Sequence, residues 1–282
     1  MTIQNAVGEL HRVYVRPPDH TSMHAWADYG WHAAPDPGRA ADEHLAFREA
    51  LADVGGEIVV GSTQVPDDPD AIYVYDPALP TDRGVILLRP GKPGRRAEPA
   101  ALEADLTSAG LAVLGRLTAP ATAEGGDMFW LDESTLLVGR GYRTNDEGIA
   151  QIRALLPDEV ELAAFDLPHH KGPDECLHLM SFISPLDHDL AVVFPPMMPV
   201  RLLDLLRRRG ISFVEVPEEE YDSQGANVLA LAPRVALSLE GNPATRRRME
   251  AAGVDVRTFT GQEISRKGDG GPTCLSRPLE RA

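Results

Sequence analysis

Cysteine is scarce in this sequence, and long apolar runs are missing from it. The 282 residues include two cysteines, Cys176 and Cys274, which excludes a disulfide framework and is typical of a reducing compartment. No apolar run reaches the roughly 18 residues of a membrane-spanning helix. The first residues, MTIQNAVGELHRVYV, lack the pattern of a signal peptide. With 43% hydrophobic residues, we expect a cytoplasmic protein with a substantial core.

Positive charge is also in short supply. The chain carries 27 Lys and Arg against 43 Asp and Glu, a formal net charge of −16. Nucleic acid is therefore excluded as a partner, because its phosphates would be repelled. The charge favours a cationic small substrate, although it would serve solubility equally well. No linker or low-complexity segment interrupts the chain, so we expect a single domain over residues 1–282.

An apolar run that ends in a basic or Pro/Gly turn recurs along the chain, which predicts buried strands. A helical pattern and another short strand-like run follow each one. Glycine closes the helical pattern in four units, as expected for a left-handed C-cap, and Pro157 takes its place in the third. The predicted strands lie within 11–18, 84–93, 134–145, 189–196 and 234–243, and the closing glycines are Gly55, Gly110, Gly210 and Gly253.

Five similar strand–helix–strand units favour radial closure around a centre, because closure removes exposed sheet edges. We therefore predict an α/β propeller with pseudo-fivefold symmetry. The alternative is an open doubly wound sheet. No GxGxxG pattern follows the first strand, and strands flank each helix on both sides, which weakens that alternative.

The segment AEGGDMFWL contains two acids around a glycine pair. Backbone freedom at Gly125 and Gly126 would let Glu124 and Asp127 face one pocket. An equally weighted alternative is a turn before a strand, with both acids in solvent.

The segment DECLHLMSF, residues 174–182, alternates in a way that predicts a strand with His178 opposite two leucines. Taken alone, this pattern favours a histidine at a strand edge whose hydrogen bonds are made within the protein. Cys176 would share a face with His178 and could suggest a metal pair. No second pair follows at zinc spacing, so we predict no metal site.

Acids also bracket AIYVY, residues 71–75, which reads as another strand. Asp70 and Asp76 are six residues apart and would share one face, where a guanidinium could bind a carboxylate. The alternative is that both acids form turns. Two further loops, RPGKPGRRAE and GRGYRTNDEG, carry arginines. One of Arg95, Arg96 and Arg143 could bind a carboxylate through two parallel hydrogen bonds. The alternative is that these arginines lie on the surface without a ligand.

Near the end of the chain, GDGGPTCLSRPLERA places Cys274 beside two glycines and a proline. Thiol, histidine, carboxylates and arginines thus occur mostly at the ends of predicted strands in different units. In a closed array they would meet at the centre. There a thiolate could attack a carbon, a histidine could move protons and acids could hold a cation.

These segments resemble the guanidino-group-modifying enzymes, which include dimethylarginine dimethylaminohydrolases, arginine deiminases and arginine:glycine amidinotransferases. The resemblance covers most of the chain in the family's order, and it implies a five-bladed α/β propeller, the pentein fold. The matching segments are DAIYVYD, RPGKPGRRAE, EGGD, GRGYRTN, LHLMSF and GGPTCLSRPL.

The resemblance implies a catalytic group. Cys274 would be the nucleophile that attacks the guanidinium carbon, and His178 the general acid and base. Glu124 would orient either His178 or the substrate. The implied reaction is hydrolysis of arginine or an N-methylated arginine to citrulline and an amine through a covalent amidino-thioether, with no metal or organic cofactor.

The resemblance also implies a substrate-binding group. Asp76 would bind guanidinium nitrogens, with Asp127 and Asp70 as weaker candidates for the same pocket. Arg95 and Arg143 would clamp the carboxylate of an amino acid. The expected partner is a small guanidino compound, with neither nucleic acid nor membrane, and a homodimer is compatible with this class.

Alternatives within the resemblance are arginine deiminase-like activity, amidinotransferase activity and a non-catalytic binding protein on the same fold. Members of the last kind lack the thiol, so the presence of Cys274, His178 and Glu124 argues against it. Tyr75 stands where dimethylaminohydrolases usually carry Glu, and Met180 where deiminases usually carry Asp, while the C-terminal segment is more similar to deiminases. Residues 21–37 could cover the site, or they could form a packed surface loop.

Overall fold

The computed structural model describes residues 2–53, 55–173 and 175–282 and has an α/β fold built of small sheets. Within these residues there are five three-stranded sheets with one common plan. A central strand pairs in parallel with one neighbour and antiparallel with the other. The central strands are β1 (Leu10–Val15), β4 (Gly84–Leu87), β7 (Thr135–Arg140), β10 (Leu190–Val193) and β13 (Val235–Leu239).

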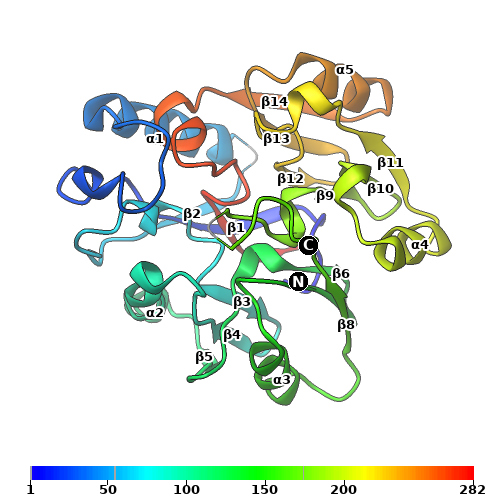
Figure 1. Ribbon diagram of the computed structural model, residues 1–282, viewed down its shortest axis with the longest axis horizontal. Helices are drawn as coiled ribbons and strands as arrows, with labels where there is room; N and C mark the ends of the chain where they lie inside the picture. The colour runs from blue at the N-terminus through cyan, green and yellow to red at the C-terminus, as the bar shows by residue number, and fades with distance from the viewer. Residues whose placement is uncertain (1, 54, 174) are drawn as a thin grey trace.

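A helix leads from each central strand to its parallel neighbour, and Figure 1 shows these five helices at the periphery of the molecule. The predicted strand–helix–strand units are thereby confirmed. The helices are α1 (Pro37–Ala52), α2 (Glu98–Ser108), α3 (Asp146–Leu155), α4 (Val200–Arg208) and α5 (Pro243–Ala251). The parallel strands are β2 (Glu57–Val60), β5 (Val113–Arg116), β8 (Glu161–Asp166), β11 (Ser212–Glu215) and β14 (Asp255–Phe259).

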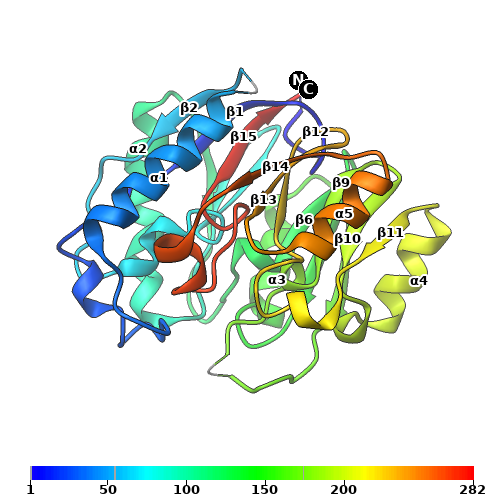
Figure 2. The ribbon, with the colours of Figure 1, turned by 90° about the horizontal axis from the view of Figure 1, so that it is seen from above.

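The third strand of each sheet, antiparallel to the central one, is the element that the sequence pattern did not predict. In four sheets it precedes the central strand, whereas the first sheet takes it from the end of the chain. There β15 pairs with β1, so the two termini lie side by side (Figure 2). These strands are β3 (Ala78–Thr81), β6 (Met128–Asp132), β9 (Ile183–Asp187), β12 (Val228–Ala232) and β15 (Arg277–Arg281).

The glycines that close four of the helical segments adopt the left-handed conformation that the sequence predicted. Gly55 and Gly253 have φ of 85°, and Gly110 and Gly210 have φ of 82° and 76°. Few other residues adopt this conformation cheaply, which explains why glycine recurs at these positions.

Two predicted strands are wrong. Residues 71–75 do not form one, because a 3₁₀ helix, η2 (Pro69–Ile72), begins at Pro69, whose fixed φ suits a first turn, and a turn follows it. Asp174 lies outside the described residues, and the rest of 174–182 is a loop that leads into the 3₁₀ helix η5 (Leu179–Ser181). The Ser181 hydroxyl accepts a bond from the His178 N–H at 3.0 Å and stabilises this turn.

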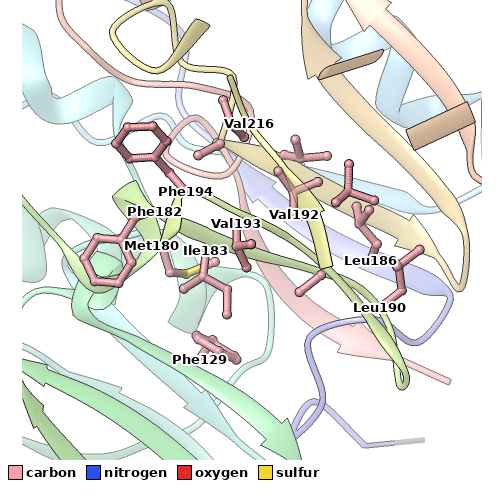
Figure 3. Packing of buried hydrophobic residues seen from close by; sticks show 14 of the residues in the cluster. Phe129, Met180, Phe182, Ile183, Leu186, Leu190, Val192, Val193, Phe194 and Val216 are labelled. Carbon is pink, nitrogen blue, oxygen red and sulfur yellow. The ribbon is translucent and has the colours of Figure 1, made fainter. Parts of the chain in front are cut away.

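The core cluster around β9 and β10 anchors the segment that follows His178. Met180 and Phe182 pack there with Phe129 of β6, and Figure 3 shows these side chains together. Phe182 is fully buried. The site loops are therefore attached to the hydrophobic core, which restricts their movement. No helix in the described residues is both long and apolar enough to span a bilayer.

Candidate active site

Five polar side chains occupy the same place in five sheets, just ahead of the antiparallel strand. Asp76 precedes β3, Glu124 precedes β6, His178 precedes β9, Asn227 precedes β12 and Cys274 precedes β15. Contacts described below connect these loops to one another. The repeat itself therefore assembles the site.

Glu124 and His178 form a buried pair at the centre of this group. Glu124 Oε2 lies 2.7 Å from His178 Nε2. The Gly91 N–H donates to Oε1 at 2.9 Å, and Arg143 Nη1 lies 3.2 Å and 3.1 Å from the two carboxylate oxygens. Because both oxygens are already bonded, Glu124 is held rigidly and fixes the orientation of the imidazole.

The charges around this pair favour its ionised form. Burial opposes the charge on His178, yet the neighbouring side chains of Cys176, Asp76 and Asp127 raise the pKa of His178 well above its ordinary value. For Glu124, burial acts to raise the pKa, but the hydrogen bond to His178 and the charge of Arg143 together hold it far below its ordinary value. The pair is therefore an imidazolium and a carboxylate at neutral pH.

Asn227 holds Cys274 in place from the neighbouring loop. Asn227 Nδ2 donates to the sulfur at 3.2 Å, and Asn227 Oδ1 accepts from the Thr273 N–H at 3.1 Å. A Cβ at Gly271 would lie 2.4 Å from Asn227 Cγ, so this glycine permits the close approach. The glycines before Cys274 thus let the thiol loop pack against the amide. Sequence reasoning missed Asn227, whose only local signal is its place before an apolar strand.

The thiol of Cys274 is neutral in the free protein at neutral pH. Burial raises its pKa to about 11, and the negative charge of Asp76 adds to the effect. The hydrogen bond from Asn227 and the charge of His178 act in the opposite direction. A second cation beside the sulfur would favour the thiolate further.

Asp76 faces the same centre and is bonded on both oxygens. Oδ1 accepts from the Gly126 N–H at 2.8 Å, and Oδ2 lies 2.6 Å from Arg95 Nη1. A Cβ at Gly126 would lie 2.6 Å from His178 Nδ1 and 3.0 Å from Asp76 Oδ1. The second glycine of EGGD is therefore needed for close packing between the acid and the histidine.

Asp127 is fully buried, and protein groups surround its carboxyl. Oδ2 accepts from the Thr144 hydroxyl at 2.7 Å and Oδ1 from the Leu179 N–H at 3.1 Å. Burial raises the pKa of Asp127 to about 7. These bonds tie together the loops that carry Glu124 and His178.

Arg95 is buried and surrounded by acids. It makes a bidentate pair with Glu98, at 2.6 Å and 3.0 Å, besides its bond to Asp76, and Nη2 also donates to the Tyr73 carbonyl at 3.0 Å. Asp70 Oδ2 lies 3.9 Å from Nε. Burial opposes the charge, but Glu98, Asp76 and Asp70 raise the pKa of Arg95 well above its ordinary value. Glu98 was also missed, although its spacing of three from Arg95 was visible.

Arg143 is largely buried and differs from its neighbours in having donors to spare. Among the described residues it bonds Glu124 through Nη1 alone, which leaves Nε and Nη2 for another acceptor. Arg96 is exposed, and its Nε donates to the Pro90 carbonyl at 3.5 Å. Arg143 is thus the arginine of the site that has a donor fork available.

Asp70 lies at the edge of the site and connects it to residues 21–37. Its oxygens accept from Trp31 Nε1 at 2.8 Å and from Lys92 Nζ at 2.6 Å. Trp31 is buried against Tyr73, and His32 Nε2 lies 2.6 Å from Asp269 Oδ2. This segment therefore contacts the loops that carry Asp70 and Asp269.

Asp76, Glu124 and His178 bring three potential metal-ligand atoms within 4.8 Å of one another. Arginines bond the oxygens of both acids, so a metal ion would compete with two guanidinium groups. Cys176 is exposed, and its sulfur lies 3.7 Å from His178 Nδ1. The donor set suits a planar organic cation better than a metal ion.

Comparison with known proteins agrees with this site. The arginine deiminase family model matches residues 60–209 and 200–281. A dimethylarginine dimethylaminohydrolase from Pseudomonas aeruginosa is 30% identical over 245 residues, covering 86% of this chain and 89% of that protein. An arginine deiminase from Rhodococcus opacus is 29% identical over 195 residues, covering 58% of this chain and 47% of that protein.

Solved structures show the same fold. A mutant of the Pseudomonas aeruginosa dimethylarginine dimethylaminohydrolase complexed with citrulline superposes with a TM-score of 0.77 at 26% identity, covering 95% of this chain and 98% of that one. The N-terminal domain of ArgZ, a cyanobacterial arginine dihydrolase, has a TM-score of 0.83 at 19% identity, covering 97% and 98%. The chain therefore belongs to the arginine deiminase family, within the guanidino-group-modifying enzymes that its sequence resembles.

Proposed function

We propose that this protein is a cysteine-dependent hydrolase of the guanidino group of arginine or an N-methylated arginine. Its products would be citrulline and ammonia or an amine. The observation that carries the proposal is one hydrogen-bonded network. In it, the Tyr75 N–H donates to the Cys274 carbonyl, the EGGD glycines donate to Asp76, and Glu124 pairs with His178. The relatives named for dimethylarginine and arginine hydrolysis support the same class of substrate.

Asp76 is the proposed ligand for the substrate guanidinium. A carboxylate offers about four acceptor positions, and the protein uses two of them here, through Gly126 and Arg95. The remaining positions can accept N–H groups from a planar cation. Its bond to Arg95 supports this role, because that partner is itself a guanidinium.

The bound cation would also activate the thiol. The charge of Asp76 helps to raise the pKa of Cys274. A guanidinium beside Asp76 offsets that charge and adds a positive one, so the thiol loses its proton to solvent more easily. The substrate thereby promotes formation of its own nucleophile.

The proposed reaction has two halves. The Cys274 thiolate forms a bond to the guanidinium carbon, His178 donates its proton to the leaving nitrogen, and the C–N bond breaks to leave an amidino-thioether. Neutral His178 then takes a proton from water, and the hydroxide adds to the same carbon. The C–S bond breaks, its electron pair returns to the Cys274 sulfur, and the added hydroxyl gives its remaining proton to solvent as the ureido C=O forms. The products are a ureido group and a free amine, and the imidazolium is restored.

Other members of the site have supporting roles in this proposal. Glu124 orients His178 rather than the substrate, because its oxygens are fully bonded within the protein. Arg143 binds the substrate carboxylate with its spare donors. Arg95 would join it only after leaving Asp76 or Glu98, and Asp70 and Asp127 position their neighbours.

The architecture that we propose for this catalytic unit is a single domain, closed as a five-bladed propeller. Five sheets with one strand plan support closure, as does the pairing of β15 with β1. The equivalent positions of the five site residues support it as well.

The test is a panel of guanidines with identification of the released amine. Arginine, monomethylarginine and dimethylarginine are incubated with the protein, and ureido product and ammonia, methylamine or dimethylamine are measured. Cys274→Ser should abolish turnover while the circular dichroism spectrum is retained. Full activity of that variant excludes the covalent mechanism, and no product from any guanidine excludes the hydrolase. Formation of a new guanidine when glycine is added would identify an amidinotransferase instead.

A further inference from the structure

Two arginines of β15, the strand that follows the Cys274 loop, are buried. Arg277 and Arg281 are 4% and 2% exposed. They are four residues apart on one strand, so their side chains share a face. Burial of two like charges on one face is costly unless negative groups lie nearby.

Neither arginine has a carboxylate partner in the part of the chain that the structure describes. Arg281 donates to two neutral carbonyls, those of Gly8 at 2.5 Å and Ala230 at 2.9 Å. Arg277 lies with its Cζ 4.0 Å from the ring centre of Tyr75. Its Nε and Nη1 are buried and have no protein acceptor among the described residues. Two guanidinium donors are thus left for another ligand.

A small cavity borders these unpaired donors. It has a volume of about 40 Å³ for water-sized occupants, and Arg277, Arg281 and Asn5 line it together with Thr273 and Tyr75. Such a volume accommodates one small ion or a few water molecules, since one water needs roughly 10–15 Å³ measured in this way. Asn5 Oδ1 accepts from the Val7 N–H at 3.1 Å, so its amide NH₂ remains as another donor.

We propose that this cavity is a binding site for a single small monovalent anion, such as chloride, held by Arg277 and Arg281. An anion would accept from the free nitrogens of Arg277 and would balance the charge of both guanidiniums. Water could satisfy the hydrogen bonds but would leave two cations unbalanced in the interior.

The electrostatic environment supports this assignment. Burial lowers the pKa of Arg277 below its ordinary value. Burial is also the main cause that lowers the pKa of Arg281 to about 10, and the nearby charge of Arg277 contributes. A lowered arginine pKa is expected when a buried guanidinium has too little negative charge around it.

The site would stabilise the loop that carries the proposed nucleophile. The Tyr75 ring lies against Arg277, while the Tyr75 N–H donates to the Cys274 carbonyl at 3.2 Å. An anion that holds Arg277 over this ring therefore supports the backbone of Cys274 from behind. The expected effect is on stability, and it does not depend on the substrate proposed above.

The test compares anions at constant ionic strength in the whole protein. Replacing sodium gluconate by sodium chloride or bromide should raise the melting temperature by about 3 °C when the anion exceeds its Kd tenfold. Arg277→Gln should lose this response, whereas Arg207→Gln, which changes an exposed arginine of α4, should keep it. A response to chloride that is unchanged in Arg277→Gln, or that is lost equally in Arg207→Gln, would overturn the proposal.

A crystal grown in bromide gives an independent readout that needs no variant. An anomalous peak within about 3.5 Å of Arg277 Nε or Nη1 is expected, because halides accept from guanidinium donors at that range. Density without anomalous signal would mean that water occupies the cavity, and the proposal would be wrong. This outcome would leave the proposed hydrolase untouched.

Discussion

Two buried arginines flank the Tyr75–Asp76 dipeptide, and their surroundings are opposite. Arg95 bonds Asp76 and Glu98, and these negative charges raise its pKa despite burial. Arg277 lies against the Tyr75 ring without a carboxylate partner among the described residues, and burial lowers its pKa. One side of the dipeptide is a compensated charge network, and the other carries excess positive charge.

These opposite surroundings determine how a substitution on each side of the dipeptide changes the free energy of unfolding. In the network around Arg95, removal of one member leaves a buried charge without its partner, which is severely destabilising. Removal of Arg277 instead takes away a charge that the protein does not balance. Replacing arginine should therefore destabilise the protein much more at position 95 than at position 277.

The largest expected effect is that of Arg95→Met. It leaves Asp76 and Glu98 buried without their cation, so the free energy of unfolding should fall by about 3–5 kcal/mol. Arg277→Met is the matched variant and should change it by no more than about 1 kcal/mol in chloride-free buffer. Urea denaturation at pH 7 measures both. Similar losses in the two variants would show that the comparison is mistaken.

A second test on the site side concerns Asp127, whose carboxyl has a pKa of about 7 in the folded protein. The folded state keeps a proton that the unfolded chain releases near pH 4. Stability should therefore fall as the pH rises from about 4 to about 7, by no more than about 4 kcal/mol. Asp127→Asn should remove this dependence, because an amide does not ionise.

Urea unfolding of both forms at pH 5 and pH 8 measures this effect. The wild type should lose stability relative to Asp127→Asn at pH 8. A difference that stays constant with pH would show that Asp127 does not titrate in this window.

A third test separates positioning from binding at Glu124. Glu124→Gln keeps the shape of the side chain but removes the charge that orients His178, so kcat should fall about 10²–10³-fold with a small change in KM. Steady-state kinetics on whichever substrate the panel identifies measures this. A rise in KM with kcat unchanged would instead indicate that Glu124 binds the substrate directly.

The central strands and helices could be predicted from sequence, but the antiparallel strands could not. Three of them contain a proline, Pro80 in β3, Pro185 in β9 and Pro278 in β15, which argues against a strand in a sequence pattern. Each of these strands lies at the edge of its sheet, where proline is tolerated. Edge position depends on tertiary pairing, so the local pattern does not reveal it.

The site could be predicted only in part for a similar reason. Residue chemistry and resemblance selected Cys274, His178 and Glu124, whereas Asn227 donates to a sulfur 47 positions further along the chain. Nothing local marks such a partner. Tyr75 and Met180 line one cavity together, and only the structure brings them near each other.

The smallest expected effect is that of Cys176→Ser on the pH dependence of turnover. The Cys176 sulfur lies 3.7 Å from His178 Nδ1 and helps to raise the pKa of His178, so its replacement should lower that pKa. His178 must carry a proton to release the amine in the proposed mechanism, and activity is lost as this proton leaves. The basic limb of the kcat profile should therefore move to lower pH, with no more than about a tenfold change in kcat near neutrality. Arg277→Gln, on the other side of the dipeptide, is the control and should leave the basic limb of the kcat profile in place. If this limb moved in Arg277→Gln but not in Cys176→Ser, Arg277 rather than Cys176 would control the pKa of His178.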